Sequence, residues 1–332
     1  MKHSNISIFV PHRGCPNNCS FCNQKVISGQ IKSANAEDVK KAVLTAIDHN
    51  VNPKDTEIAF FGGSFTAIER TDVLSLLTAA KYFMDSYGFA GIRISTRPDA
   101  INDEILKILK EYGVRSIELG AQSMDDEVLK ANDRGHTVKD VITASEKIKS
   151  AGFSLGLQMM TGLYKSSWEK DIQTAKRIIE IKPDTVRIYP TVVLKNTKLG
   201  ELYIKGEYMP PDAEQSAPHV AQMMQLFSKA DIKIIKVGLH ASEDVEKDMI
   251  AGAYHPAFKE MCESSIFLEK ILKELSNYDP KGKYEIYVAD KSLSKAKGLN
   301  KRNEKTLKNK GFHCIIKGKE FMNDNEVEVV EI

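Results

Sequence analysis

Short apolar segments alternate with amphipathic segments along most of this chain, and this alternation limits the folds that it can adopt. The apolar, β-branched segments predict strands at residues 6–10, 57–61, 91–96, 116–119, 154–160, 185–193 and 232–239. Between them, apolar residues recur three and four positions apart, which predicts helices at about residues 37–49, 72–87, 103–112, 138–150, 168–181 and 214–229. The chain is therefore predicted to be an α/β protein with six strand–helix units and a further strand.

Strands that are joined through helices run parallel to one another, with right-handed crossovers. Six such units form either a partial (βα)6 barrel or an open, doubly wound sheet, and in both folds the functional groups gather at the carboxyl ends of the strands. Polar or glycine-rich residues follow the second to the sixth predicted strand, at Gly62-Gly63-Ser64, Ser95-Thr96-Arg97, Gly120 with Gln122, Thr161-Gly162 and Tyr189-Pro190. We therefore expect these segments to surround one cavity.

Three cysteines follow the first predicted strand with the spacing C-x3-C-x2-C: Cys15, Cys19 and Cys22. Gly14, Pro16 and two asparagines flank them, which predicts a sharply turning loop. Three thiolates on one loop can hold three irons of a [4Fe–4S] cluster and leave the fourth iron open to bind a small molecule. The loop is therefore a candidate metal centre at the same edge of the sheet as the other polar segments.

Two other interpretations of the cysteines remain at this point. They could be incidental buried cysteines, or they could bind zinc, which usually takes four protein ligands in a structural site. No fourth Cys or His stands nearby at the spacing of a zinc finger. Disulfide bonds do not explain this cysteine pattern well, because the chain has five cysteines, an odd number, and three of them lie within eight residues.

Length and composition set wider limits. A chain of 332 residues with 42% hydrophobic residues can build one large domain with a small appendage. No apolar run reaches the roughly 18 residues of a membrane span. The first residues enter a predicted strand almost at once and show no leader-like apolar region, so we expect a cytoplasmic protein.

The composition changes near residue 281. Residues 281–319 contain 12 Lys or Arg and three acids, a local charge of +9, whereas the whole chain carries only +2. This part predicts a strand at 284–288, a basic helix at about 293–310, a strand at 312–317 and an acidic end at 326–331. We divide the chain into a barrel (1–240), a helical connector (241–280) and a small basic α+β subdomain (281–332). The basic helix is either a solvated surface or a surface that attracts polyanions such as RNA.

The cysteine spacing resembles the hallmark of the radical S-adenosylmethionine (radical SAM) superfamily. The similarity extends over roughly residues 5–210: the motifs there resemble the radical domain of the Elongator catalytic subunit and, more distantly, the oxygen-independent coproporphyrinogen oxidases. The motifs that carry it are Gly62-Gly63-Ser64-Phe65, Thr96-Arg97-Pro98-Asp99, Glu118-Leu119-Gly120-Ala121-Gln122-Ser123, Asn132-Asp133-Arg134-Gly135-His136-Thr137, Met159-Met160-Thr161-Gly162-Leu163 and Arg187-Ile188-Tyr189-Pro190-Thr191-Val192-Val193.

This resemblance implies two cofactors, a [4Fe–4S] cluster on Cys15, Cys19 and Cys22 and S-adenosylmethionine, which is cleaved to a 5′-deoxyadenosyl radical. It also implies an electron donor such as a flavodoxin or ferredoxin and, by analogy with the Elongator branch, modification of tRNA or another RNA. Two alternatives stay open: a radical enzyme that acts on a tetrapyrrole or other small molecule, and an iron–sulfur RNA-binding protein without catalysis. No membrane partner is expected.

The resemblance also implies which residues contact the cofactor. Gly62 and Gly63 would let the backbone approach the methionine amino group, and Arg134 would pair with its carboxylate, unless it forms a surface salt bridge instead. Gln158 occupies a ribose-contact position but could merely cap a strand. The complete set of candidate cofactor-binding residues is Phe21, Gly62, Gly63, Ser64, Ser95, Gln122, Arg134, Gln158 and Tyr189.

The chain departs from the family pattern at three places. Ser95 stands where the related motifs place an acid, so one carboxylate is missing or supplied elsewhere, and Tyr164 replaces a usual proline. Only about 50 residues follow residue 280, which is too few for the acetyltransferase domain of the Elongator subunit. We therefore do not expect the complete acetyl transfer reaction of that subunit from these residues alone.

Two histidines and a cysteine remain without a role. His240 ends the last predicted strand, and His255 precedes Cys262 by seven residues. These three could form a second metal site, although a lone helical cysteine is usually a small core residue. His240 could instead face the substrate.

Overall fold

The structure is a computed structural model that describes residues 4–10, 15, 19–23, 33–240, 242–280 and 282–332. Seven parallel strands form the main sheet, in the order β1-β2-β3-β4-β5-β6-β8. Their bounds are Ser4–Val10 (β1), Thr56–Gly62 (β2), Gly91–Thr96 (β3), Val114–Gln122 (β4), Ser154–Thr161 (β5), Thr185–Pro190 (β6) and Lys233–Val237 (β8). The strand order follows the chain, as a partial barrel requires, so this prediction is confirmed.

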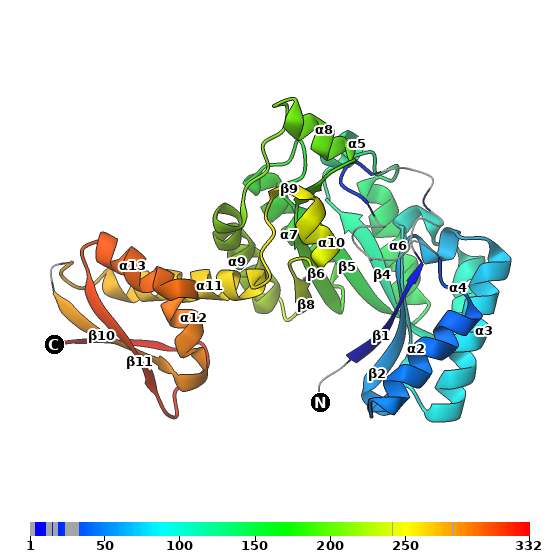
Figure 1. Cartoon of the computed structure of the whole chain (residues 1–332), viewed down its shortest axis with the longest axis horizontal. Helices are drawn as coiled ribbons and strands as arrows, with labels where there is room; N and C mark the ends of the chain where they lie inside the picture. Colours follow the sequence, from blue (N-terminus) through cyan, green and yellow to red (C-terminus); the bar gives the residue numbers. More distant parts are fainter. Residues whose placement is uncertain (1–3, 11–14, 16–18, 24–32, 241, 281) are drawn as a thin grey trace.

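Helices cover the outer face of this sheet (Figure 1). They are α2 (Ala36–Asp48), α3 (Arg70–Tyr87), α4 (Asp103–Glu111), α5 (Asp126–Ala131), α6 (Val138–Ser150), α7 (Trp168–Ile181) and α9 (Ala213–Lys229). Alternate strand residues such as Ile58, Phe60 and Ile92 are fully buried against the helices, because successive side chains of a strand point to opposite faces. The other strand residues face the interior of the partial barrel.

Capping explains where several helices begin. Asn35, Thr137 and Asp212 each accept a hydrogen bond from a backbone N–H of the first turn, and each forms a reciprocal capping box with the residue three positions later. These caps fix the residues at which α2, α6 and α9 begin.

The sixth predicted strand is shorter than expected. It ends at Pro190, and the following residues Val192–Leu194 form a separate strand, β7, which pairs antiparallel with β9 (Met249–Gly252). A proline has no N–H to donate to the ladder, and the hydroxyl of Thr191 instead donates to the carbonyl of Thr161. The two short helices α8 (Lys198–Ile204) and α10 (Glu243–Asp248) flank this small sheet and were not predicted.

The last part of the chain forms a second, smaller unit at the other end of the molecule (Figure 1). Its sheet has the order β11-β10-β12, with β10 (Lys283–Ala289) parallel to β11 (His313–Lys319) and antiparallel to β12 (Val327–Glu331). The acidic end therefore becomes a third strand. The single basic helix that we predicted is wrong: it is divided into α12 (Leu293–Lys297) and α13 (Arg302–Asn309), because Gly298, Asn300 and Lys301 have left-handed backbone conformations.

One helix, α11 (Phe258–Leu275), contributes to the cores of both units. Phe258, Met261 and Cys262 pack in the core of the large sheet, and Phe267, Ile271 and Leu275 pack in the core of the small one. The buried amide of Asn303 donates to the carbonyls of Ser264 and Ala296 and so fastens α13 to α11 and α12. The segment 241–280, predicted as a helical connector, contains α10, β9 and α11; the domain boundaries themselves stay predictions. In the described residues, no helix is both long and apolar enough to cross a membrane.

Candidate active site

A cavity of about 1230 Å³ lies at the carboxyl ends of the barrel strands and extends into the barrel interior. All but one of the candidate site residues line it: Cys15, Cys19, Phe21, Cys22, Gly62, Gly63, Ser95, Gln122, Arg134, Gln158 and Tyr189. The exception is Ser64, whose buried hydroxyl bonds to Thr96 and accepts from the backbone N–H of Arg97. The sequence prediction of one shared cavity therefore agrees with the geometry. Ser64 does not line the cavity; its hydroxyl links the turn after β2 to the end of β3.

The cysteine loop is fastened to the rest of the barrel at Ser20. Its hydroxyl donates to the buried side chain of Asn132 (2.7 Å), and its backbone N–H donates to the carbonyl of the same residue (3.2 Å). The carbonyl of Ser20 accepts from the N–H of Leu199 in α8. The predicted turn residues Gly14 and Pro16 lie outside the described residues.

The three thiols line one cavity, but the described residues hold no group of three Cys, His, Asp or Glu side chains close enough together to bind a metal ion. We therefore judge the fit to a cluster from the donors and their surroundings. The three thiols are the only cysteine thiols among the residues that line this cavity, and two arginines stand beside them. This donor set suits a cluster with three protein ligands.

The two arginines, Arg134 and Arg97, supply positive charge next to the thiols. Arg134 is only 7% exposed and donates to the sulfur of Cys19 (Nη1–Sγ 3.1 Å) and to the carbonyl of Gly120 (Nη2–O 2.7 Å), so it is not a surface salt bridge. Burial, followed by the charge of Cys19, raises the pKa of the Cys15 thiol, while Arg97 and Arg134 oppose this rise. Negative charge at Cys15 is therefore favoured by these two guanidinium groups and by a backbone hydrogen bond from Ser64.

Three buried polar atoms around the cavity have no hydrogen-bond partner among the described residues: Arg97 Nη1, Gln122 Oε1 and Arg134 Nε. Arg97 is otherwise held by a bidentate ion pair with Asp99 (2.9 and 2.6 Å). Buried polar groups are normally satisfied, and unsatisfied ones concentrate where a ligand completes them. Two donors and one acceptor are thus available to a polar cofactor.

A β-bulge aims Gln122 into the cavity. Gly120 is opposite Gln158 and Gln122 is opposite Met159, so Ala121 is an extra residue in β4. Gln122 has a left-handed backbone (φ 64°), which is uncommon for a residue other than glycine and costs energy that functional sites often store. Gly120 leaves room beside it: an added Cβ would lie 2.9 Å from Gln122 Nε2 and 3.3 Å from Arg134 Nη2.

We expect the substitution Gly120→Ala to weaken cofactor binding without unfolding the protein. The new methyl group meets the flexible ends of Gln122 and Arg134, so these side chains are displaced rather than the backbone. Loss of one charge-assisted hydrogen bond weakens binding by about tenfold or more. Titration calorimetry of the cluster-loaded protein with S-adenosylhomocysteine measures the change. As a control, Gly206→Ala introduces strain at a left-handed position (φ 73°) with no neighbour within 4 Å and should leave this affinity unchanged.

The barrel interior contains a buried network of charges. Arg93 donates to Glu57 (2.6 Å) and to Glu118 (3.0 Å), and Arg187 forms a bidentate pair with Glu118 (2.6 and 2.9 Å). Gln158 also donates to Glu118 (2.9 Å), so it does not merely cap the strand. The carboxylate of Glu118 thereby positions Arg187 and Gln158 at the wall of the cavity.

This network bears on position 95, where this chain has a serine and the related motifs have an acid. Ser95 is directly opposite Glu118 in the β3–β4 register, so Glu118 is the nearest acid by strand pairing. However, the oxygens of Glu118 already accept four hydrogen bonds, which uses the capacity of a carboxylate. Glu118 therefore orients its neighbours and leaves no lone pair for a ligand at position 95.

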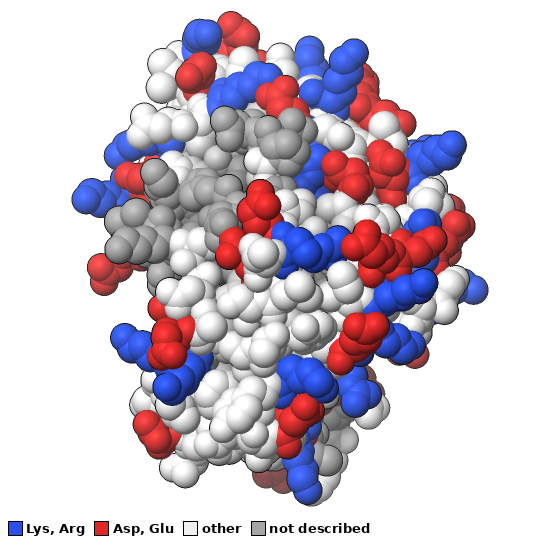
Figure 2. Space-filling view, turned by 90° about the vertical axis from the view of Figure 1, so that its right-hand side faces the viewer, with Lys and Arg blue, Asp and Glu red and all other residues white. Residues whose placement is uncertain are grey.

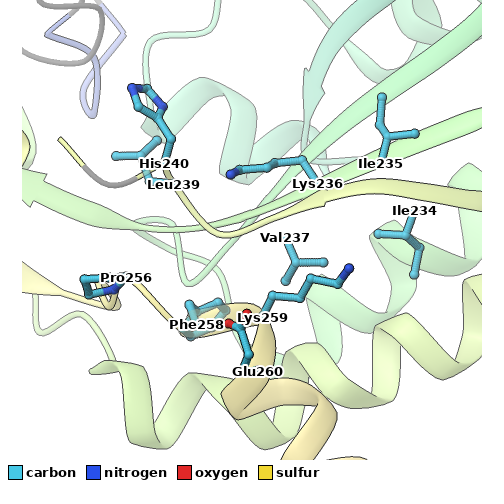
Figure 3. A pocket seen from close by; sticks show the side chains of 10 residues that line it. All are labelled: Ile234, Ile235, Lys236, Val237, Leu239, His240, Pro256, Phe258, Lys259 and Glu260. Atoms are coloured by element: carbon cyan, nitrogen blue, oxygen red, sulfur yellow. The ribbon is translucent and has the colours of Figure 1, made fainter. Parts of the chain in front are cut away.

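His240, His255 and Cys262 do not form a metal group in the described part of the chain. Cys262 is fully buried in the core side of α11, and burial raises the pKa of its thiol. His255 accepts from the N–H of Ala257 through Nδ1 (3.0 Å). His240 lines the large cavity and also a smaller one of about 240 Å³ beside β8 (Figure 3).

Sequence reasoning missed the roles of Arg97 and Glu118. Arg97 directly follows a strand and precedes Asp99 by two residues, which was an available signal for an oriented arginine at the strand end. Glu118 is an acid inside an apolar strand, and acids are almost never buried unless they are paired.

The chain belongs to the radical SAM superfamily: the model of that superfamily matches residues 9–178, and the model of the Radical_SAM C-terminal domain matches residues 183–267. It is therefore a radical SAM enzyme, and the family implies a [4Fe–4S] cluster and S-adenosylmethionine. The resemblance to the Elongator branch is also confirmed, because the chain is 34% identical to human Elongator complex protein 3 over 55% of its own length and 37% of that protein.

Two archaeal proteins show how far the similarity reaches. The "Uncharacterized protein MJ0486" of Methanocaldococcus jannaschii is 31% identical, over 68% of each chain. The tRNA uridine(34) acetyltransferase of the same organism is 34% identical over 41% of this chain but only 26% of its own length. The chain thus spans a minor part of that acetyltransferase.

Solved structures support the fold. The Elp3 protein of Methanocaldococcus infernus superposes with a TM-score of 0.63 at 20% identity and covers 82% of this chain and 62% of that protein. Coproporphyrinogen III oxidase (HemN) from Escherichia coli superposes with a TM-score of 0.50 at 17% identity, over 69% of this chain and 53% of that one.

Proposed function

We propose that this enzyme holds a [4Fe–4S] cluster through Cys15, Cys19 and Cys22, binds S-adenosylmethionine in the large cavity and modifies RNA. The observation that carries the first two parts is the convergence of three thiols and two oriented arginines on one cavity. When bound, the cluster and S-adenosylmethionine together supply a 5′-deoxyadenosyl radical. The resident residues bind and orient the cofactor, and Phe21, whose ring lies 5.9 Å from the guanidinium of Arg134, shields it from water.

The cofactor contacts follow from the same geometry. Arg134 is positioned to pair with the methionine carboxylate, because it is buried and keeps one free donor, Nε. Gln122 Oε1 is an acceptor for the amino group or the ribose, and Arg97 Nη1 is a second donor. Gln158 and Tyr189 form the wall that would face the nucleoside. Ser64 belongs to this site only through its backbone, since its side chain is turned to Thr96.

A product assay tests the radical chemistry. The chain is loaded anaerobically with iron and sulfide, reduced with dithionite or a flavodoxin system, and given S-adenosylmethionine. We expect 5′-deoxyadenosine, detected by chromatography with mass spectrometry. If a chain with a full complement of iron and sulfide forms none, the proposed activity is refuted.

The proposal of an RNA substrate rests on the relatives and on charge. Relatives that share the radical domain are named as tRNA uridine(34) acetyltransferases, and in this chain the basic segment contributes exposed lysines at the surface of the small unit. Lys301, Lys305 and Lys308 are exposed and form no ion pair with any described residue, whereas Arg302 pairs with Glu214 (3.3 Å). On the face of the barrel shown in Figure 2, by contrast, basic and acidic side chains are interspersed.

We expect the triple substitution of Lys301, Lys305 and Lys308 by Gln to weaken tRNA binding and to reduce its salt dependence. Each lysine that neutralises a phosphate contributes about one unit to the slope of log affinity against log salt, so the slope should fall by about two to three. Filter binding at several salt concentrations measures it. The matched control replaces Lys41, Lys107 and Lys139, exposed lysines on α2, α4 and α6. Equal effects of both triple variants would contradict a role for the small unit.

A further inference from the structure

Lys236 faces the barrel interior because of an irregularity in β8. Val186 is opposite Ile234, but the next residue, Arg187, is opposite Lys236, so Ile235 is an extra residue in β8. A shift of one residue moves a strand side chain to the other face of the sheet. Without this bulge, Lys236 would be opposite Ile188 and would point into the apolar layer under the helices. Bulges of this kind often re-aim a side chain next to an active site.

The resulting arrangement is unfavourable in the absence of a ligand. Lys236 and Arg187 are like charges directly opposite each other on neighbouring strands, which destabilises a sheet. The pKa of Lys236 is lowered, first by burial and then by the charges of Arg187 and Lys259, and Glu260 opposes this only weakly. Lys236 forms no ion pair with any described residue, and the acid that serves Arg187, Glu118, has no lone pair left. One positive charge in the barrel interior is therefore uncompensated.

This charge stands where two cavities meet. Lys236 and His240 line both the large cavity and the smaller one of about 240 Å³. Figure 3 shows their side chains on the same side of β8, while Lys259 and Glu260 approach from α11 on the other side. β8 is one edge of the sheet, and β1, which precedes the cysteine loop, is the other. A group bound by Lys236 would thus occupy a different wall of the cavity from the thiols.

We propose that Lys236 and His240 form an anion-binding subsite for a phosphate group of the substrate. An ammonium group with three donors and an imidazole suit a phosphate that enters from the mouth of the cavity, and its charge would relieve the repulsion between Lys236 and Arg187. The identity of the phosphate carrier as a nucleotide rests on the proposed function. The carboxylate of S-adenosylmethionine is the other anion that could reach the cavity, so the test distinguishes the two.

The test uses the full chain and matched pairs of probes. Calorimetry compares each of the four nucleoside 5′-monophosphates with the nucleoside that lacks the phosphate. We expect at least one monophosphate to bind about tenfold more tightly than its nucleoside, and Lys236→Met to abolish this difference. Lys233→Met, the same change at the exposed first residue of the same strand, should preserve it. His240→Ala, an exposed position where folding is not at risk, should reduce it.

Three results would overturn the subsite. The first is a wild-type chain that binds no monophosphate more tightly than its nucleoside, and the second is equal behaviour of the Lys236 and Lys233 variants. The third is a Lys236→Met chain that keeps its preference for the phosphate but loses affinity for S-adenosylhomocysteine, which would assign Lys236 to the cofactor. These titrations do not depend on radical formation, so absence of 5′-deoxyadenosine would refute the proposed activity and leave this inference standing.

Thermal unfolding of Lys236→Met should show an unchanged or higher midpoint, because a like-charge pair is removed.

Discussion

Cys19→Ala is expected to lose the iron–sulfur absorbance and to form no 5′-deoxyadenosine. On the proposed assignment, each of the three thiolates binds one iron, and no other thiol lines the cavity to replace a lost ligand. The substitution also removes the acceptor of the hydrogen bond from Arg134 Nη1. Iron and sulfide analysis, the visible spectrum and the product assay measure the effect after anaerobic loading.

The control for this prediction is Cys314→Ala. Cys314 lies half-buried in β11 of the small unit, away from the cavity, so the variant should keep both the absorbance and the product. A Cys19→Ala chain that retains a complete cluster would show that the ligand assignment is wrong, whatever its activity.

Glu118→Gln is expected to lower the free energy of unfolding by about 3–5 kcal/mol, because it leaves two buried guanidinium groups without their shared carboxylate. Glu118 is 1% exposed and accepts from Arg93, Arg187 and Gln158. Urea or thermal unfolding measures the loss. Glu104→Gln removes a carboxylate from Arg70 at a similar distance (3.0 Å) but at the surface, where an ion pair contributes only about 0–1 kcal/mol.

The loss of stability caused by Glu118→Gln should depend on pH. Burial acts to raise the pKa of Glu118, but Arg187, Arg93 and Gln158 outweigh it and hold the pKa below its ordinary value of 4.5. A carboxyl whose pKa is depressed in the folded state stabilises the protein above its unfolded pKa, and this contribution is lost as the pH falls through the folded pKa. The stability difference between wild type and Glu118→Gln should therefore be full near neutral pH and shrink below pH 4.5. A difference that stays constant into acid would show that the ion pairs are not its source.

The regular elements of the barrel could be predicted because each one follows from a local pattern. The predicted helices 138–150 and 168–181 have the same bounds as α6 and α7, where apolar spacing and a Thr or Ser cap agree. The break at Pro190 was missed because the apolar run continues through Val193. The division between α12 and α13 was missed although Gly298 was an available signal. The positive φ angles of Asn300 and Lys301 leave less trace in a basic segment.

The candidate site was predictable to the level of loops but not of side-chain orientation. Parallel strands bring their carboxyl ends to one edge, which was sufficient to expect the cysteines and Gly62 around one cavity. Arg134 was expected there only from the family resemblance. The bulges at Ala121 and Ile235 were not predictable, because each depends on the pairing register of two strands. Because of these bulges, Gln122 and Lys236 face the cavity. The orientation of these two polar side chains therefore depends on how the strands pair, which the local sequence does not reveal.

Because α11 belongs to both cores, its length sets the distance between the cavity and the basic surface of the small unit. From Phe258 to Leu275 it rises about 26 Å at 1.5 Å per residue, and each residue also adds a rotation of about 100° around the helix axis. Length and direction are thus coupled: a relative with one residue more in this helix would present its basic lysines to a different side of the molecule. The helix length therefore sets both how far from the cavity and at which angle a bound polyanion would be held.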